Sequence, residues 1–300
     1  MRQELTNVQP DILFDPSIVQ IPFSDLQLLE RLGVGASGVV HKALWTLPES
    51  LIPREVAVKE LLLSFDDLGN EALQEFLSEI KLMSLLKHPN VAEFLGICVA
   101  PGGTNLYLVT ELMHRGNLRD VIDRKGQNLD WQLRWKLAKD AAKGMEYLHS
   151  VNLIHRDLKP QNLLVNEKWE CKVADFGIST ISGHTTKMTC IGTPVYMAPE
   201  VLTKDKYSTK ADVYSFAVLL LEIYSGNIPY SDLPLNQAQL MYKIISEGLR
   251  PAMGALPAPL QLLIQDCWDE NAPLRPSFSE VIVRLDRLKN LSLPPSKTIE

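Results

Sequence analysis

The feature that most constrains the fold of this 300-residue chain is a change in hydrophobic pattern near residue 116. Residues 26–111 consist mainly of short apolar or alternating runs separated by glycine, proline and polar residues, which is typical of β-strands. After residue 116 the apolar residues recur every three or four positions, which is typical of amphipathic helices. We therefore predict an α+β protein with a strand-rich first lobe, a helical second lobe and a cleft near residues 111–116.

The first lobe contains one segment with a helical pattern. Its apolar residues follow the spacing i, i+3, i+4, i+7 of one helix face: Leu73, Phe76, Leu77, Ile80 and Met83. The sequence HPN at residues 88–90 is expected to end this helix. The strands are expected at residues 28–34, 39–45, 55–60, 91–99 and 106–110.

The second lobe carries recognisable helix starts. Asp130 is a candidate N-cap for a helix that continues to about residue 149. Residues 209–212 have capping-box spacing, with aspartate in place of glutamate, before an apolar helix that ends at Gly226. Further helices are expected at residues 237–247, 259–268 and 277–289, and a short hairpin at residues 163–165 and 171–173. The chain before residue 25 is expected to be an extended lead-in.

Charge and cysteine content disfavour several classes of function. Thirty Lys and Arg against 36 Asp and Glu give a net charge of −6, which disfavours general binding to nucleic acid or anionic membranes but leaves room for a local basic patch. The apolar runs are too short to span a bilayer, and the charged first 20 residues do not resemble a signal peptide. The four cysteines, which form no C-x-x-C motif, favour reduced thiols in a cytoplasmic protein.

A glycine-rich segment follows the first predicted strand. Residues 33–40 read GVGASGVV, and Gly33, Gly35 and Gly38 would let the backbone turn tightly and bring N–H groups close to phosphate oxygens. Taken alone, a strand–turn–strand without a ligand is an equally good interpretation. A dinucleotide site is disfavoured, because that motif needs a helix after the glycines and residues 39–43 have a strand pattern.

A lysine within the apolar sequence VAVK favours the interpretation of the glycine-rich segment as a phosphate-binding site. The ammonium group of Lys59 costs on the order of several kcal/mol there unless it is paired or faces solvent. Glu79 lies roughly 95° from the centre of the apolar face of the predicted helix, against about 135° for Glu75. We therefore predict that Glu79, rather than Glu75, reaches inward to Lys59.

The sequences HRDLKPQN at residues 155–162 and DFG at residues 175–177 bring several chemically apt groups together. The carboxylate of Asp157 could accept a hydrogen bond from a hydroxyl, and Lys159 could neutralise a phosphoryl group. Asn162 and Asp175 offer oxygen ligands of the kind that Mg²⁺ prefers. Any one of them alone is better explained as a solvated loop residue or a helix cap.

Taken together, the motifs resemble the protein kinase family. The glycine-rich segment, VAVK, Glu79, HRDLKPQN, DFG and APE at residues 198–200 occur in the order and at the spacings of that family. The resemblance implies a two-lobed fold that transfers the γ-phosphoryl group of ATP, with Mg²⁺ or Mn²⁺, to protein hydroxyls. It also implies an N-terminal extension (1–24), a kinase domain (25–289, with lobes at about 25–112 and 113–289) and a C-terminal tail (290–300).

The resemblance assigns roles to individual residues. Lys59 paired with Glu79 would align the phosphates, Asp157 and Lys159 would act on the hydroxyl and the phosphoryl group, and Asn162 and Asp175 would bind the metal. The residues expected to contact ATP are Gly33, Val34, Gly35, Ala36, Ser37, Gly38, Val40, Ala57, Lys59, Thr110, Glu111, Met113, Leu164 and Asp175. Asp212 would anchor the catalytic loop, and Glu200 would pair with Arg275.

The same resemblance indicates which hydroxyl is the acceptor. Lys159 stands where serine/threonine kinases have lysine, and Thr193 would bond Asp157 and Lys159. Residues 212–217 and 267–278 instead resemble tyrosine kinases, and this combination is typical of the tyrosine-kinase-like group. Dual or tyrosine specificity and a small-molecule substrate stay open as alternatives. A pseudokinase scaffold is disfavoured because the catalytic lysine and both aspartates are present.

Regulation is expected in the hydroxyl-rich segment at residues 178–191. We expect its phosphorylation, in trans and therefore through self-association, to order it against Arg156, a cation predicted to lean toward the interior. A hydroxyl-rich loop without a regulatory role is the alternative. The expected partners are ATP and proteins with serine or threonine acceptors, and neither nucleic acid nor membrane is expected.

Overall fold

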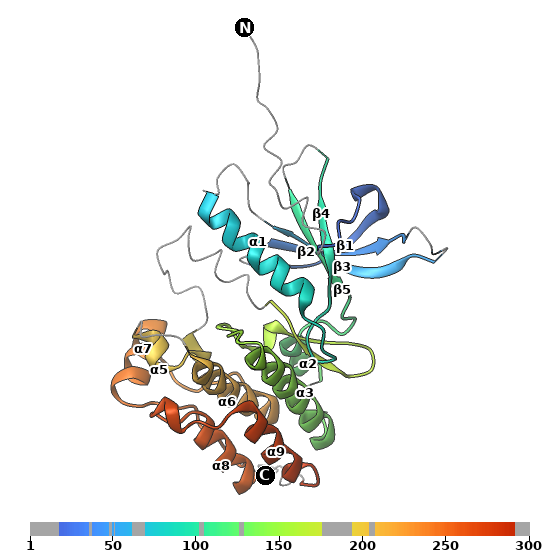
Figure 1. The fold of residues 1–300 in the computed structure, drawn as a ribbon. Coiled ribbons are helices and arrows are strands. Elements are labelled where there is room, and N and C mark those ends of the chain that lie inside the picture. The colour runs from blue at the N-terminus through green and yellow to red at the C-terminus, as the bar shows by residue number, and fades with distance from the viewer. Residues whose placement is uncertain are drawn as a thin grey trace. The chain divides into compact units, whose positions relative to one another are not determined.

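The computed structural model describes most of the chain as two compact units (Figure 1). The described residues are 18–35, 38–47, 50, 52–61, 70–101, 105–125, 129–175, 194–203 and 208–291, without the side chains of residues 35 and 70–77. Within them, the smaller unit comprises the residues up to 87 together with 92–112, and the larger unit comprises 88–91, 113–175 and 194–291. The smaller unit is built on a sheet and the larger one on helices, which confirms the predicted α+β class.

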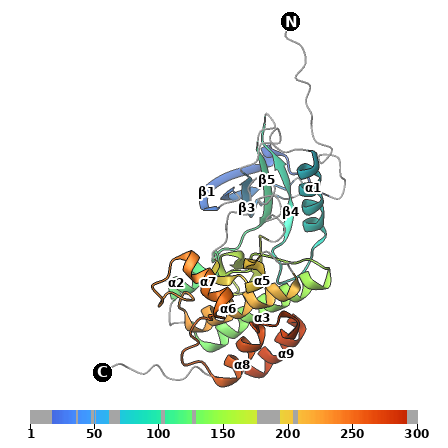
Figure 2. The ribbon, with the colours of Figure 1, turned by 90° about the vertical axis from the view of Figure 1, so that its left-hand side faces the viewer.

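The smaller unit is a five-stranded antiparallel sheet in the order β1-β2-β3-β5-β4. The strands are β1 (Leu26–Gly35), β2 (Gly38–Trp45), β3 (Arg54–Leu61), β4 (Phe94–Val99) and β5 (Leu106–Glu111). Helix α1 (Asn70–Leu85) lies alongside β4 in both ribbon views (Figures 1 and 2). Burial alternates along β3, because Val56 and Val58 enter the core while Ala57 and Lys59 face the other side.

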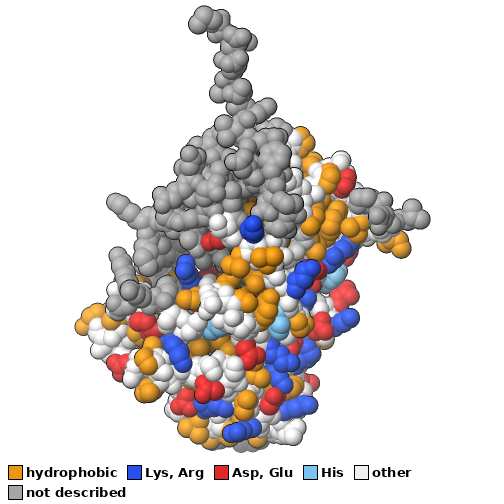
Figure 3. All heavy atoms as spheres, in the orientation of Figure 1, with side chains coloured by type: hydrophobic (Ala, Val, Ile, Leu, Met, Phe, Trp, Pro, Cys, Tyr) orange, Lys and Arg blue, Asp and Glu red, His pale blue; other side chains and the backbone are white. Residues whose placement is uncertain are grey.

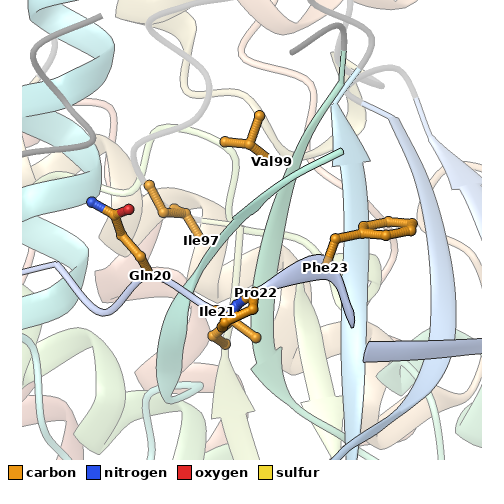
Figure 4. Close-up of a pocket in the computed structure, with 6 residues that line it drawn as sticks. All are labelled: Gln20, Ile21, Pro22, Phe23, Ile97 and Val99. Atoms are coloured by element: carbon orange, nitrogen blue, oxygen red, sulfur yellow. The ribbon is translucent and has the colours of Figure 1, made fainter. Parts of the chain in front are cut away.

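The described part of the N-terminal lead-in pairs with the edge of this sheet. The Ile21 N–H donates to the Ile97 carbonyl at 2.8 Å, and the Ile97 N–H donates to the Val19 carbonyl at 2.9 Å. Gly96 has φ +158°, and a Cβ there would overlap the Val19 carbonyl. The lead-in therefore covers an edge strand that would otherwise expose unpaired backbone groups. A hollow beside this pairing (Figure 4) is lined by Gln20, Ile21, Pro22, Phe23, Ile97 and Val99.

The strand predicted to begin at residue 91 begins three residues later. Residues 88–91 belong to the larger unit, where Asn90 pairs with the hairpin instead. Its carbonyl accepts from the Val173 N–H at 2.9 Å, and its side chain donates to the Cys171 carbonyl at 3.0 Å. The prediction was wrong because an apolar run does not show which backbone partner it will meet.

The larger unit is mainly helical (Figure 1). Its elements are α2 (Leu118–Lys125), α3 (Trp131–Ser150), β6 (Leu163–Val165), β7 (Cys171–Val173), α5 (Pro199–Leu202), α6 (Thr209–Ser225), α7 (Gln237–Ser246), α8 (Ala258–Cys267) and α9 (Phe278–Leu288). The predicted N-cap at Asp130 is confirmed, since its carboxylate accepts from the Leu133 N–H. Helix α2 was not predicted, because only Leu118, Val121 and Ile122 mark its apolar face.

Helix α6 is the buried axis of this unit, since every side chain from Ala211 to Tyr224 is buried. It begins one residue earlier than the predicted capping box implied. Ser208 is the N-cap and accepts from the Lys210 N–H, whereas Thr209 is already helical. On the visible outer face of this unit, charged side chains of both signs are interspersed (Figure 3), as expected for helices with one apolar face.

Two further predictions from composition can be compared with the described residues. Within them, no helix is both long enough and apolar enough to cross a bilayer. The described cysteines, Cys98, Cys171 and Cys267, are free and buried. Burial raises the pKa of the Cys98 thiol to about 11, which leaves it mainly protonated and poorly reactive at neutral pH.

Close packing between α3 and the hairpin predicts the effect of Gly144→Ala. A Cβ at residue 144 would overlap the Asn90 carbonyl oxygen and lie 2.7 Å from Cγ2 of Val173. We expect the free energy of unfolding to fall by about 1–3 kcal/mol, measured by urea denaturation. Helix propensity alone would raise it by about 1 kcal/mol, so an unchanged or higher stability would contradict this packing.

Candidate active site

The loop at residues 155–162 is attached to α6 by one buried carboxylate. Asp212, 1% exposed, accepts from the His155 N–H at 2.9 Å and from the Arg156 N–H at 3.0 Å. It also bonds the His149 Nε2 atom on α3 at 2.8 Å. Asp212 lies in the first turn of α6, where the helix dipole favours a negative charge. The predicted anchoring of the loop by Asp212 is confirmed.

His155 connects this loop to the segment that carries Asp175. Its buried ring accepts from the Asp157 N–H at Nδ1 (3.3 Å), so Nε2 carries the proton and donates to the Ala174 carbonyl at 3.1 Å. The Ala174 N–H in turn donates to the Asn162 carbonyl at 2.9 Å. The backbone positions of Asp157 and Asp175 are therefore fixed relative to each other.

The side chains of Asp157, Lys159 and Asn162 converge. Lys159 Nζ donates to Oδ2 of Asp157 at 2.6 Å. The Asn162 amide nitrogen donates to the same oxygen at 2.9 Å and to the Asp157 carbonyl at 2.7 Å. The Asn162 amide oxygen is the atom left to bind a metal. The Asp157 side chain keeps a third of its surface exposed and so stays accessible to a substrate hydroxyl.

Two residues near these converging side chains, Arg156 and Asp175, have strained backbone conformations. Arg156 has φ +69° and Asp175 has φ +55°, values that cost a non-glycine residue of order 1–3 kcal/mol. Both residues are exposed, which corrects the prediction that Arg156 leans toward the interior. The Arg156 N–H bonds the buried Asp212, so its backbone faces the interior while the residue as a whole is exposed.

In the smaller unit, four of the predicted nucleotide residues share one face of the sheet. Val40 of β2 pairs directly with Lys59 of β3, and Ala57 pairs with Thr110 of β5. Directly paired residues in an antiparallel sheet point to the same side, so Val40, Ala57, Lys59 and Thr110 line one surface. Glu79 lies on α1 in the same unit with its side chain partly buried, and its pairing with Lys59 stays a prediction.

The glycine-rich segment forms the β1–β2 hairpin, with Gly35 paired with Gly38. A strand follows it, which confirms the predicted strand pattern of residues 39–43. Gly38 has φ +152°, and a Cβ there would overlap the Glu60 carbonyl of β3. This glycine is therefore required by sheet packing whatever the hairpin binds. At Gly33 a Cβ would have no neighbour within 4 Å.

The other predicted residues divide between the units or lie outside the described residues. Val34 and Glu111 belong to the smaller unit, and Met113 and Leu164 to the larger one, with Leu164 on β6. Ala36, Ser37, Thr193 and the segment 178–191 lie outside the described residues.

The predicted pair of Glu200 and Arg275 is confirmed. Arg275, 1% exposed, donates from Nη1 at 2.6 Å and from Nη2 at 3.0 Å to the two carboxylate oxygens of Glu200. Such a two-point bond is stronger than a single charged contact, because it neutralises both groups and fixes their geometry. It connects the start of α5 to the segment before α9.

Sequence reasoning missed a second buried carboxylate on α6. Glu222 is fully buried, accepts from the Tyr196 hydroxyl at 2.5 Å and pairs with Arg119 of α2. Burial raises the pKa of Glu222, and the bonds from Tyr196 and Arg119 oppose that rise. The available signal was an acidic residue within an apolar helix, which is costly unless hydrogen-bonded. The cluster joins residues 194–196 to the core.

Comparison with known proteins agrees with this geometry. Residues 26–285 match the model of the family described as protein tyrosine and serine/threonine kinase. A probable serine/threonine-protein kinase of Dictyostelium discoideum is 39% identical over 91% of this chain and 29% of its own length. The same organism's probable serine/threonine-protein kinase drkA is 39% identical over 89% of this chain and 40% of its own length.

A plant protein is similar to a comparable degree. The serine/threonine-protein kinase CTR1 of Arabidopsis thaliana is 37% identical over 94% of this chain and 34% of its own length. The chain thus spans between 29% and 40% of the length of these relatives. The resemblance inferred from the motifs is confirmed.

The buried bonds of Asp212 predict a local effect of Asp212→Ala. The His155 and Arg156 N–H groups would lose their shared acceptor, at a cost of about 1–3 kcal/mol. We expect amide hydrogen exchange at these two positions to become roughly 10- to 100-fold faster. Asp286→Ala, which removes an exposed carboxylate paired with Lys139, should leave these rates unchanged. Equal rates in both variants would show that Asp212 does not hold the loop.

Proposed function

Since the chain belongs to the protein tyrosine and serine/threonine kinase family, we propose that it transfers the γ-phosphoryl group of ATP to serine or threonine hydroxyls of proteins. Members of this family use ATP with a divalent metal and act on protein hydroxyls. The observation that carries the proposal is the Asp157 carboxylate, bonded by Lys159 and Asn162 in a loop attached to the buried Asp212.

The geometry suggests how Asp157 would act. Lys159 and Asn162 both donate to Oδ2, so Oδ1 is the oxygen available to accept a hydrogen bond from the substrate hydroxyl. Asp157 would orient that hydroxyl and take its proton as the new oxygen–phosphorus bond forms. The bond from the γ-phosphorus to the β–γ bridging oxygen would break in the same step, with ADP as the leaving group. Lys159 would neutralise charge that develops on the transferring phosphoryl group, and Thr193 would bond Asp157 and Lys159 on the acceptor side.

The donor set also suits a metal–nucleotide complex. Mg²⁺, or Mn²⁺ in its place, takes few protein ligands and completes its shell with phosphate and water oxygens, which fits one amide oxygen and one carboxylate. Asn162 and Asp175 would hold the metal, which would offset the negative charge of the phosphates. Lys59, oriented by Glu79, would contact the α- and β-phosphates.

The remaining nucleotide contacts are proposed from the shared face of the sheet and from the resemblance. Backbone groups of residues 33–38 would cover the phosphates. Val40, Ala57 and Leu164 would contact the base, and the backbone between Glu111 and Met113 would bond it, with Thr110 beside it. The support in the smaller unit is that Val40, Ala57, Lys59 and Thr110 point to one side of the sheet.

The serine/threonine specificity is supported by Lys159 and by the names of the relatives. A dual or tyrosine specificity is the alternative, favoured by the tyrosine-kinase-like pattern of residues 212–217. We further propose a cytoplasmic protein with a kinase domain at residues 25–289, preceded by an extension at residues 1–24 and followed by the tail that begins at residue 290. Its partners would be ATP, protein substrates and a second copy of itself, with no role for nucleic acid or membrane.

Changing Asp157 to asparagine tests the proposed base. We expect Asp157→Asn to reduce phosphoryl transfer about 10²- to 10⁴-fold, because the amide cannot accept the proton. Transfer from labelled ATP with Mg²⁺ to a protein substrate measures it, and nucleotide binding should persist. The matched control is Asp266→Asn, a surface carboxylate paired with Arg284, which should leave the rate unchanged.

Identification of the labelled amino acid tests the acceptor. Phosphoserine and phosphothreonine are expected. Mainly phosphotyrosine would overturn the specificity, and label on small molecules alone would overturn the protein substrate. If the wild-type chain transfers no phosphate even after its hydroxyl-rich segment is phosphorylated, the enzymatic proposal fails and a scaffold remains.

Phosphorylation within residues 178–191 would activate the enzyme. This segment offers Ser179, Thr180, Ser182, Thr185, Thr186 and Thr189. A phosphate there would add about two negative charges close in sequence to the catalytic loop, where the exposed Arg156 could contact them. Mass spectrometry of the active enzyme should find phosphate on this segment. Because the phosphorylation is proposed to occur in trans, the rate of phosphate incorporation should rise with protein concentration. Full activity without any phosphate there would refute the regulation.

A further inference from the structure

The turn between β6 and β7 presents an aromatic ring beneath two cations. The guanidinium carbon of Arg115 lies 3.8 Å from the centroid of the Trp169 ring, and the ammonium nitrogen of Lys125 lies 5.1 Å from it. Both distances are within the range of cation–π attraction, which lets like charges gather on one ring. The ring is partly exposed, so it is also open to contact from outside.

This turn is held in one conformation by several hydrogen bonds. The Asn166 side chain accepts from the Lys168 and Glu170 N–H groups at 3.0 Å each. Lys136 of α3 donates to the Trp169 carbonyl at 2.7 Å. Trp169 has φ +60°, which such bonds must hold against its steric cost. The ring is therefore presented at a fixed position.

Four cations on or next to this turn are not neutralised: two contact the ring, one bonds the Arg115 carbonyl, and one precedes Trp169 in the chain. They are Arg115, Arg124, Lys125 and Lys168, and none lies within ion-pair distance of a carboxylate in the described part of the chain. The two guanidinium groups donate instead to backbone carbonyls, Arg115 to Glu167 at 3.0 Å and Arg124 to Asp120 at 3.0 Å. A carbonyl carries no net charge, so the positive charge remains.

The nearby carboxylates of the described residues do not pair with these four cations. Two of them have other partners, and a third has a lowered pKa. Glu167 is 3.9 Å from the His114 ring, and the Asp120 carboxylate accepts from Asn117. A hydrogen bond from Asn166 lowers the pKa of Glu170 below its usual range. Burial opposes this shift, and the charges of Lys136, Lys168 and Lys172 add to it. The surroundings of the turn are thus electropositive although the chain has a net charge of −6.

A second tryptophan in the same unit shows the contrast. Trp135 also has two cations near its ring, with Lys139 at 5.1 Å and Lys289 at 5.2 Å. There, however, Lys139 is paired with the carboxylate of Asp286. The presence of two cations near one ring therefore does not by itself indicate an interaction surface. The unneutralised charge around Trp169 is the distinguishing feature.

We propose that Arg115, Arg124, Lys125, Lys168 and Trp169 form a docking surface, the Trp169 surface, for an acidic segment of a partner protein. Carboxylates would pair with the four cations, and an apolar side chain of the segment would contact the ring. A short acidic peptide meets only the local field. A nucleic acid or an anionic membrane extends over a much larger area and meets the net negative charge of the whole chain.

The test uses the full chain and a fluorescein-labelled peptide of eight glutamates, with a peptide of eight glutamines as its neutral counterpart. Fluorescence anisotropy should show binding of the glutamate peptide that weakens as salt is raised. Lys125→Gln with Lys168→Gln should weaken it on the order of tenfold, and the two glutamate substitutions should weaken it further. Neither ammonium group makes a hydrogen bond to a described residue, so folding should persist, as urea denaturation would check.

The matched control changes the net charge equally at another place. Arg287→Glu with Lys289→Glu on the far end of α9, near Trp135, should leave the affinity for the peptide within twofold. Equal losses in the two glutamate double variants would overturn the proposal by showing a general charge effect. Absence of binding would overturn it as well. So would tighter binding of a single-stranded oligonucleotide or of phosphatidylserine vesicles through the same lysines, because the surface would then serve another class of partner.

Discussion

The arrangement of this active site depends on one buried carboxylate. Asp212, 1% exposed, accepts from two backbone N–H groups of the catalytic loop and bonds His149. A buried charge is tolerated only when such donors surround it. Because α6 is buried on every side, the carboxylate is a fixed point, and the bonds of His155 extend that fixed geometry to the segment before Asp175.

Helix α6 carries two buried carboxylates that each hold a neighbouring segment by hydrogen bonds. Ten residues after Asp212, on the same buried helix, Glu222 receives bonds from Tyr196 and Arg119 and so fixes the segment before α5. Asp212 fixes the loop that carries the proposed base, and Glu222 fixes the segment that follows Thr193 in the chain. The two buried acids of this apolar helix thus fix both the loop that carries the proposed base and the segment that follows Thr193. The Trp169 surface lies on another part of that unit and would add recognition without touching either acid.

Much of the fold could be predicted because the responsible interactions are local in sequence. The Asp130 cap, the helix ending at Gly226 and the hairpin at residues 163–173 each follow from neighbouring residues. The predictions were wrong where the position of an element depends on residues that are distant in the sequence. Asn90 pairs with β7 and so delays the start of β4, and α2 is stabilised by the partners of Arg119 as well as by its short apolar face. Gly38, predicted as a phosphate-loop residue, is also needed where β2 approaches β3.

By itself, the sequence determined the α+β class, the family and the identity of the acid, base and cation groups, because residue type and spacing in a motif are properties of the chain alone. The tertiary structure decided which atoms of these groups are free. It showed that Lys159 and Asn162 share one oxygen of Asp157, that Arg156 points outward, and that four cations around Trp169 lack carboxylate partners among the described residues. Pairing and exposure depend on residues that are far apart in the sequence, and only folding brings those residues within reach of one another.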